Sequence, residues 1–248
     1  MAYPFEHKER KVYSNTFLQN VLVEWYFEPI DEESFKVRVK DFLAEKFGIQ
    51  IGGDDEVQCP IAISSKARKA QMLFGLDVFK LSVRVDIYKG FDSLNPLLGF
   101  GFDYLCLNGI QNIRGCVIRK IDIFPFKNMR GDNTSNETLL GKVFSKDLLS
   151  GISISSNDAI QSIWSKEFAN VEEPEKVFIK FGFLRKRSEP SDKDVDDTMI
   201  LDFSADRFES MPVDMVEDRL LRMNQTLFDA FHWSVNQRII DIMKGDEL

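Results

Sequence analysis

The sequence predicts an α+β protein. Its first half has the ferredoxin-like order β-α-β-β-α-β, and an antiparallel three-stranded sheet with a long C-terminal helix follows. Three observations lead to this prediction. Some segments carry apolar residues at every second position, whereas others carry them at helical spacing. Turn-forming glycine, proline and asparagine separate these segments. The end of the chain carries one broad apolar stripe with helical periodicity.

A strand and a helix are expected first. Residues 21–27 are β-branched and aromatic, and Pro29 ends this segment. Asp31 is a suitable N-cap for a helix over residues 32–47, whose first turn carries two glutamates. Apolar residues recur through this segment at helical spacing, and Gly48 ends it.

The rest of the first half alternates again between strands and a helix. Residues 59–64 and 70–76 are strand candidates, and the sequence leaves open whether both form. Apolar and polar side chains alternate strictly over 79–87, which predicts a strand with one buried face. A helix is expected from 90 to 107, and a long strand from 110 to 126.

The polar, turn-rich residues 127–136 are the expected linker. They divide the chain into a ferredoxin-like half, 1–127, and a half with a sheet and a terminal helix, 128–248. One continuous domain is the alternative. The second half contains a short helix candidate and three strand candidates, at 138–149, 159–168, 176–187 and 198–208. Its closing helix carries an apolar stripe from Val216 to Ile242.

Composition places the chain among ordinary globular proteins. Hydrophobic residues make up 44% and charged residues 29%, and the 22 phenylalanines predict a phenylalanine-packed core. The net charge of −8 disfavours binding to a long phosphate backbone. The sequence shows no signal peptide and no apolar run long enough to span a membrane. We therefore expect a cytoplasmic protein without membrane association, whose three cysteines are reduced and mostly buried.

Two basic clusters are the candidate binding residues of this acidic chain. One follows the strand at 110–126, and the other lies at the end of the strand at 176–187. Their members are Arg114, Arg119, Lys120, Arg185 and Arg187. If both clusters met on one surface, they could bind a phosphate-bearing ligand or an acidic partner. The alternative is that they are ordinary solvated strand ends.

The familiar catalytic and metal-binding patterns fail at specific positions. Only His7 and His232 could serve as imidazole bases, and we expect His232 to be a partly buried structural residue. An acidic run begins like a calcium loop at Asp192, but it has Asp197 where such a loop needs glycine and Phe203 where it needs glutamate. No phosphate-binding glycine motif occurs. We therefore expect no catalytic residue, no metal ligand and no cofactor.

Three sequence blocks resemble a sporadically distributed bacterial family of conserved, uncharacterised proteins. The first contains Tyr13 and Asn15, followed by the strand that ends at Phe27. The second, Ile118-Arg119-Lys120-Ile121-Asp122, is similar to a family strand that typically has the sequence Leu-Arg-Tyr-Ile-Asn. The third combines Ile200-Leu201-Asp202-Phe203 with residues 221–236. The resemblance covers nearly the whole chain.

The chain departs from the family pattern at several polar positions. Lys120 and Asp122 replace a tyrosine and an asparagine, and Gly115 replaces an arginine. Met223-Asn224 stands where the family usually has Leu-His, so any chemistry of that histidine would be absent here. The resemblance implies no established activity, substrate or cofactor. The patchy distribution of the family implies an association with mobile elements or phage defence.

These observations support three function hypotheses. The first is a non-catalytic binding or adaptor protein of a bacterial or phage system, including a defence system. It would bind another protein through its sheet surfaces and terminal helix, and it would expose an apolar patch. The second is a nucleotide or nucleic-acid sensor, in which Arg119, Lys120 and Arg185 converge in one pocket. The third is an enzyme of unrecognised type. The sequence leaves the ligand, the pathway and the oligomeric state open.

Overall fold

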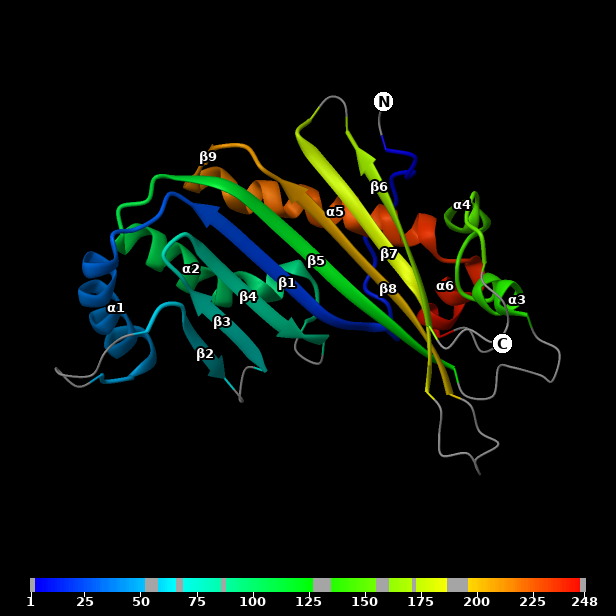
Figure 1. The fold of residues 1–248 in the computed structure, drawn as a ribbon, viewed down its shortest axis with the longest axis horizontal. Coiled ribbons are helices and arrows are strands. Elements are labelled where there is room, and N and C mark those ends of the chain that lie inside the picture. Colours follow the sequence, from blue (N-terminus) through cyan, green and yellow to red (C-terminus); the bar gives the residue numbers. More distant parts are fainter. Residues whose placement is uncertain are drawn as a thin grey trace. The chain divides into compact units, whose positions relative to one another are not determined.

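The computed structural model describes residues 3–51, 58–65, 69–85, 88–126, 135–154, 161–170, 173–186 and 196–245. These residues form six α-helices and nine strands (Figure 1). The strands make one antiparallel sheet in the order β2-β3-β4-β1-β5-β8-β7-β6, and the short strand β9 pairs with β5. The predicted α+β class is therefore confirmed.

The chain forms two compact units, and neither is continuous in sequence. Unit 1 contains residues 1–19, 119–205 and 223–248, and unit 2 contains residues 20–118 and 206–222. The boundary that the sequence places after residue 127 falls inside the range 119–205 of unit 1.

Unit 2 begins with a strand and a helix that agree with the sequence analysis. Strand β1 is Leu18–Phe27, and helix α1 is Glu32–Phe47. The side chain of Asp31 accepts a hydrogen bond from the backbone N–H of Ser34, and Gly48 ends the helix with φ at 68°. The predicted cap, helix and stop are confirmed.

Both uncertain strand candidates form, and this changes the expected order of elements. Strands β2 (Ile61–Ser65), β3 (Ala70–Phe74) and β4 (Val78–Arg84) pair in succession. The first half therefore has the order β-α-β-β-β-α-β, with one strand more than predicted. The extra strand is stable because β2 and β3 pair along all five of their residues, from Ile61 opposite Phe74 to Ser65 opposite Ala70.

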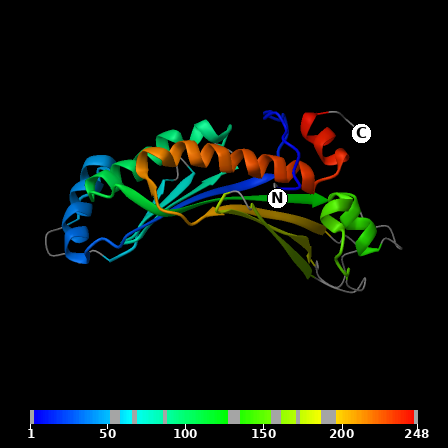
Figure 2. The same cartoon turned by 90° about the horizontal axis from the view of Figure 1, so that it is seen from above.

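The helix expected from 90 to 107 begins as the 3-10 helix η2 (Phe91–Leu94) and continues as α2 (Asn95–Leu107). A glycine in α2 permits close packing on the sheet. A Cβ atom at Gly101 would lie 2.6 Å from the rings of both Phe79 and Trp25. Helices α1 and α2 cover the same face of the strands of unit 2 (Figure 2).

An aromatic core joins these elements in unit 2. Its rings come from β1, α1, β3, β4 and α2, and they include Phe27, Trp25, Phe35, Phe42, Phe74, Phe79 and Tyr104, all buried. The hydroxyl of Tyr104 donates to the carbonyl of Gly75 at 2.9 Å. The phenylalanine-packed core predicted from the composition is therefore confirmed.

Unit 1 is built on the second half of the sheet. Strands β5 (Asn112–Phe126), β8 (Asp196–Arg207), β7 (Glu175–Lys186) and β6 (Gln161–Ala169) are neighbours in that order. The inward residues of β7 are buried as their alternation predicts, namely Val177, Ile179, Phe181 and Phe183. The three predicted strands of the second half are confirmed to within a few residues.

The closing helix is not continuous, which corrects the prediction of one long helix. Helix α5 (Val216–Ser234) ends before α6 (Gln237–Lys244), and Asn236 caps α6 by accepting from the N–H of Ile239. The backbone between them pairs with another segment, because Ser145 N–H donates to Ser234 O and Asn236 N–H donates to Val143 O. The apolar periodicity continues across this break, so the sequence pattern conceals it.

The short helix expected over 138–149 consists of two helices, α3 (Asn136–Gly141) and α4 (Lys146–Leu149). Ser135 and Ser145 cap them through their side chains, and this explains why two short turns form in place of one helix.

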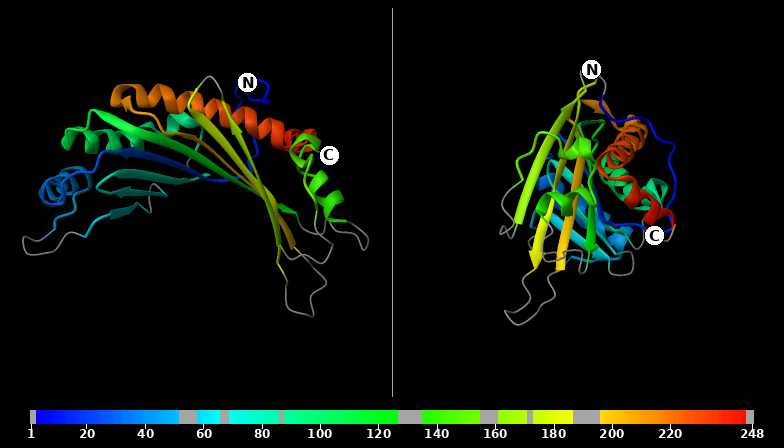
Figure 3. Two further views of the ribbon diagram at one scale, coloured as in Figure 1. Left: turned by 45° about the horizontal axis from the view of Figure 1, so that its top comes forward. Right: turned by 90° about the vertical axis from the view of Figure 1, so that its right-hand side faces the viewer.

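The N-terminal arm, residues 3–17, is extended and lies along α5 and α6 (Figure 3). Phe5 packs between Phe168 and Trp233, and the side chain of Asn15 donates to the carbonyl of Ile242. The arm therefore covers the outer surface of the terminal helices of unit 1.

Candidate functional site

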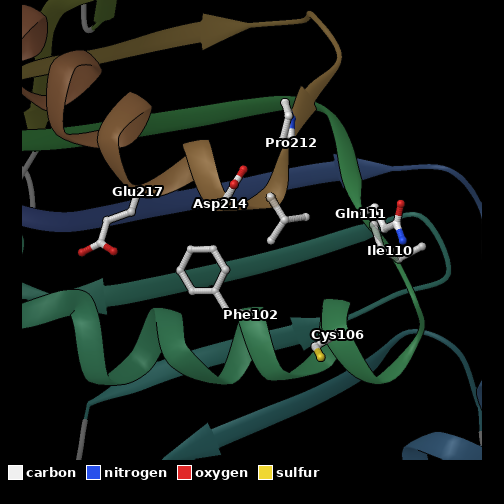
Figure 4. A pocket seen from close by; sticks show the side chains of 8 residues that line it. Phe102, Cys106, Ile110, Gln111, Pro212, Asp214 and Glu217 are labelled. Carbon is white, nitrogen blue, oxygen red and sulfur yellow. The ribbon is translucent and has the colours of Figure 1, made fainter.

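One feature that could hold a ligand is an open groove in unit 2, which we name the α2 groove. Its volume is about 590 Å³. It is lined by Phe102, Cys106, Ile110, Gln111, Pro212, Val213, Asp214 and Glu217. Figure 4 shows Phe102 and Cys106 extending from α2, with the segment that leads into α5 opposite them. The groove thus lies between one helix and the start of another.

The geometry of the groove depends on a short backbone pairing. Strand β9 (Met211–Pro212) pairs with the start of β5, with Pro212 opposite Asn112. The N–H of Val213 then donates to the carbonyl of Gln111 at 2.9 Å. The 3-10 helix η3 (Val213–Met215) and α5 follow directly, so this segment is held along α2, and the first turn of α5 reaches Asn95 at the start of α2.

The floor of the groove is apolar and its rim is acidic. Phe102 is held by its ring contact with Trp25, whose centroid is 4.6 Å away. Asp214 and Glu217 are exposed and lie three residues apart at the helix start, where carboxylates are stabilised by the helix dipole. Glu217 also accepts a hydrogen bond from the Asn95 side chain at 3.3 Å.

Two large apolar side chains that are next in sequence to lining residues are also exposed. Leu107 follows Cys106 and is 40% exposed, and Met215 follows Asp214 and is 54% exposed.

Cys106 corrects the expectation that the thiols are mostly buried. It is exposed in the α2 groove, whereas Cys59 is half-buried and Cys116 is buried. Burial raises the pKa of the Cys59 thiol. The helical periodicity of α2 explains why Cys106 is exposed. Tyr104 and Leu105 point into the core, and Cys106 follows them on the outward side of the helix.

A second cavity of unit 2, of about 570 Å³, lies between α1 and the turn that precedes β4. Its lining includes Glu32, Lys36, Cys59 and Asp77. Glu32 and Lys36 form an ion pair at 2.8 Å across one helical turn. Because these charges compensate each other, this cavity presents a less distinctive surface than the α2 groove.

The basic residues singled out by the sequence lie in different surroundings. Arg114 is exposed in unit 2, with its Nε 3.5 Å from a carboxylate oxygen of Glu28. In unit 1, Arg119 donates two hydrogen bonds to Asp202, and Lys120 is buried on the opposite face of β5. Adjacent residues of a strand point to opposite faces, so Arg119 and Lys120 do not converge. The side chain of Arg185 and the whole of Arg187 lie outside the described residues.

Lys120 and Asp122 form a buried pair on the inner face of β5. Burial lowers the pKa of Lys120 to about 8, and the charge of Asp122 opposes this shift. Burial raises the pKa of Asp122 to about 7, and the charge of Lys120 opposes that shift. Strongly shifted groups cluster at functional sites, but buried structural pairs show the same shifts.

His232 is half-buried in unit 1, and its Nε2 lies 2.7 Å from the hydroxyl of Tyr13. Burial lowers the pKa of His232, so the neutral imidazole that can accept from Tyr13 is favoured. This position agrees with the structural imidazole expected from the sequence. Residues 192–195 of the acidic run lie outside the described residues, and Asp196 and Asp197 begin strand β8.

Among the described residues, no cluster of three histidine, cysteine or carboxylate side chains is close enough to hold a metal ion. No helix among them combines the length and the apolar character needed to span a membrane.

The sequence analysis did not identify the α2 groove. Its residues come from two separated segments, 102–111 and 212–217, and only their pairing in the fold brings them together. The sequence contains one indication of the groove. Phe102 and Cys106 lie four residues apart and therefore on one face of the helix. No protein-family model and no curated protein matches this chain.

Proposed function

We propose that this protein is a non-catalytic binding or adaptor protein that holds a segment of another protein in the α2 groove. The observation that supports this function is the groove of about 590 Å³, with its apolar floor and two exposed carboxylates at its rim. Concave apolar surfaces with a few polar groups are the usual form of binding sites.

The groove favours a partner segment that combines an apolar side chain with a nearby lysine or arginine. The apolar side chain would contact Phe102 and Val213, and the cation would reach Asp214 or Glu217. The net charge of −8 would also attract a basic partner before contact. That the partner belongs to a bacterial or phage system, or to phage defence, stays a prediction.

A phosphate-binding sensor receives less support from these residues. Arg119 is engaged with Asp202, and Lys120 is buried on the other face of the strand. The rim of the α2 groove is acidic and would repel a phosphate group. An enzyme of unrecognised type receives no specific support from the exposed carboxylates of the rim.

Selection from a random peptide display library tests the proposal. We expect enriched peptides to carry an apolar residue close to a lysine or arginine. The double variant Asp214→Asn/Glu217→Gln should bind these peptides at least about tenfold more weakly, which corresponds to about 1.4 kcal/mol. The matched control is Glu33→Gln/Asp41→Asn, which removes two exposed carboxylates of α1 and should leave binding unchanged.

Cys106 provides a second readout, because its thiol lies in the groove. A bound peptide should slow the reaction of Cys106 with a maleimide and leave the reaction of Cys59 unchanged. The proposal would be wrong if the enriched peptides lacked a cation, or if they bound without protecting Cys106.

We also infer that unit 2 is an elaborated ferredoxin-like sandwich. Two features support this inference. Strand β1 lies between β4 and β5, which α2 connects, and both helices cover one face of the sheet (Figure 2). Strand β2 would then be an addition at the edge.

A further inference from the structure

Strand β6 is an edge of the sheet in unit 1. All nine of its residues pair with β7, from Gln161 opposite Leu184 to Ala169 opposite Lys176. Among the described residues no strand lies beside its other edge, as Figure 1 also shows. The outward backbone groups of an edge strand can pair with a further strand.

Among the usual protections of an edge strand, β6 has a lysine, Lys166, but lacks several others. The strand contains neither proline nor glycine, and its pairing with β7 is uninterrupted. By contrast, β2 at the other end of the sheet has only five residues and follows Pro60. A long, regular edge is more suitable for strand addition than a short one.

The side chains of β6 remain partly exposed on both faces of the sheet. Ile163 is 54% exposed on the outer face, beside Leu184 of β7, which is 39% exposed. Trp164 and Phe168 on the inner face are only half-buried. A strand added to β6 would cover apolar surface on both faces.

We propose that β6 pairs antiparallel with β6 of a second copy of this chain, about a twofold axis at Ser165. This inference concerns unit 1 and is independent of the α2 groove. All nine residues pair in this register, and each side chain faces a residue of the same sheet face. The opposed positions are Ser165 with Ser165, Trp164 with Lys166, Ile163 with Glu167, Ser162 with Phe168, and Gln161 with Ala169.

The size and charge of the opposed side chains favour a second copy as the occupant. Phe168 faces the small Ser162, and Ile163 faces the flexible stem of Glu167. Lys166 faces Trp164 through its alkyl stem, because its ammonium donates to the carbonyls of Asp147 and Ser150 of its own chain. No two like charges are opposed, whereas a register centred on Lys166 would oppose two lysines.

Sedimentation equilibrium over protein concentrations from about 1 to about 300 µM tests the proposal, since weak self-association falls in this range. We expect a concentration-dependent dimer. Ser165→Glu would oppose two carboxylates at the axis and should weaken the dimer at least tenfold (roughly 1.4 kcal/mol). The introduced carboxylate also lies opposite Lys180 of its own chain, so the fold should tolerate it. Ser165→Gln, of similar size and neutral, is the matched control and should still dimerise.

A mixture of Ser165→Glu with Ser165→Lys gives the decisive comparison. Opposite charges would then meet at the axis, and the mixed dimer should be tighter than the dimer of the Ser165→Glu protein alone. Ser64→Glu on β2, at the other end of the sheet, should have no effect. A wild-type protein that stays monomeric throughout, or a Ser165→Glu protein that dimerises normally, would overturn the proposal. A mixture without restored dimer would overturn the register.

Discussion

Arg119 of β5 donates two hydrogen bonds to Asp202 of the neighbouring strand β8, from Nε to Oδ1 at 2.7 Å and from Nη2 to Oδ2 at 2.5 Å. The carboxylate is largely buried, since the Asp202 side chain is 15% exposed. This contact assigns a structural role to the most prominent basic residue of the sequence.

We expect Asp202→Asn to lower the free energy of unfolding by about 1 kcal/mol, because a paired, partly buried carboxylate is lost. Urea denaturation of the variant measures this change. Arg114→Ala is the control, since its exposed ion pair should contribute less than about 0.5 kcal/mol. A double-mutant cycle with Arg119→Ala isolates the pair, and a coupling near zero would contradict this role.

The buried Asp122 makes stability depend on pH. Burial raises the pKa of its carboxyl group from 3.8 in the unfolded chain to about 7 in the folded chain. Between these values the folded state binds more protons, so the free energy of unfolding should fall as the pH rises from about 4 to about 7. Urea denaturation across this range should show a shallower decline for Asp122→Asn. Equal slopes for both proteins would contradict the burial of this carboxyl group.

Lys120 has the opposite effect at higher pH. Burial lowers the pKa of its amine from 10.5 to about 8, so the unfolded state binds more protons between these values. The free energy of unfolding should therefore rise as the pH increases from about 8 to about 10.5. Lys120→Met should remove this rise in the same denaturation series, and persistence of the rise in the variant would assign it to another group.

Two glycines of α2 should respond oppositely to alanine. A Cβ atom at Gly99 meets nothing within 4 Å, so Gly99→Ala should stabilise the helix by about 0.5–1 kcal/mol. A Cβ atom at Gly101 would lie 2.6 Å from the rings of Trp25 and Phe79, so Gly101→Ala should destabilise the protein by about 1–3 kcal/mol. Thermal and urea unfolding measure both. Equal effects would show that α2 does not pack as described.

Asp229 holds the N-terminal arm on α5. Its carboxylate accepts from the backbone N–H of Lys8 at 2.9 Å and from the side chain of Gln225 at 2.8 Å. Asp229→Ala should release the arm, and trypsin should then cleave after Lys8 and the following basic residues several times faster. Asp241→Ala on α6 is the matched control and should leave the cleavage rate unchanged.

Much of the local structure could be predicted because it depends on neighbours in sequence. Asp31, the apolar spacing of 32–47 and Gly48 determine α1 through contacts within the helix and its caps. The alternation of β7 likewise predicts its buried face. The break between α5 and α6 could not be predicted in this way, because it arises where residues 143–145 pair with residues 234–236.

The binding surfaces depend still more on distant parts of the chain. Arg119 and Lys120 are adjacent in sequence, but the strand directs them to opposite faces, and Asp202 engages the first of them. Asp214 and Glu217 line a candidate site because β9 pairs with β5 beside α2. A linear pattern of charges does not contain this information.

The sequence by itself determined the α+β class, the caps and faces of individual elements and the abundance of aromatic core residues, since these follow from local propensity and periodicity. The tertiary structure decided that β2 and β3 both form, that the closing helix is broken and that, within the described part of the chain, no strand pairs with the outer edge of β6. The physical reason is that pairing between distant backbone segments selects among conformations that are locally similar in energy. Arg119, which local pattern alone made a candidate ligand residue, forms an ion pair with Asp202 because this pairing makes β5 and β8 neighbours.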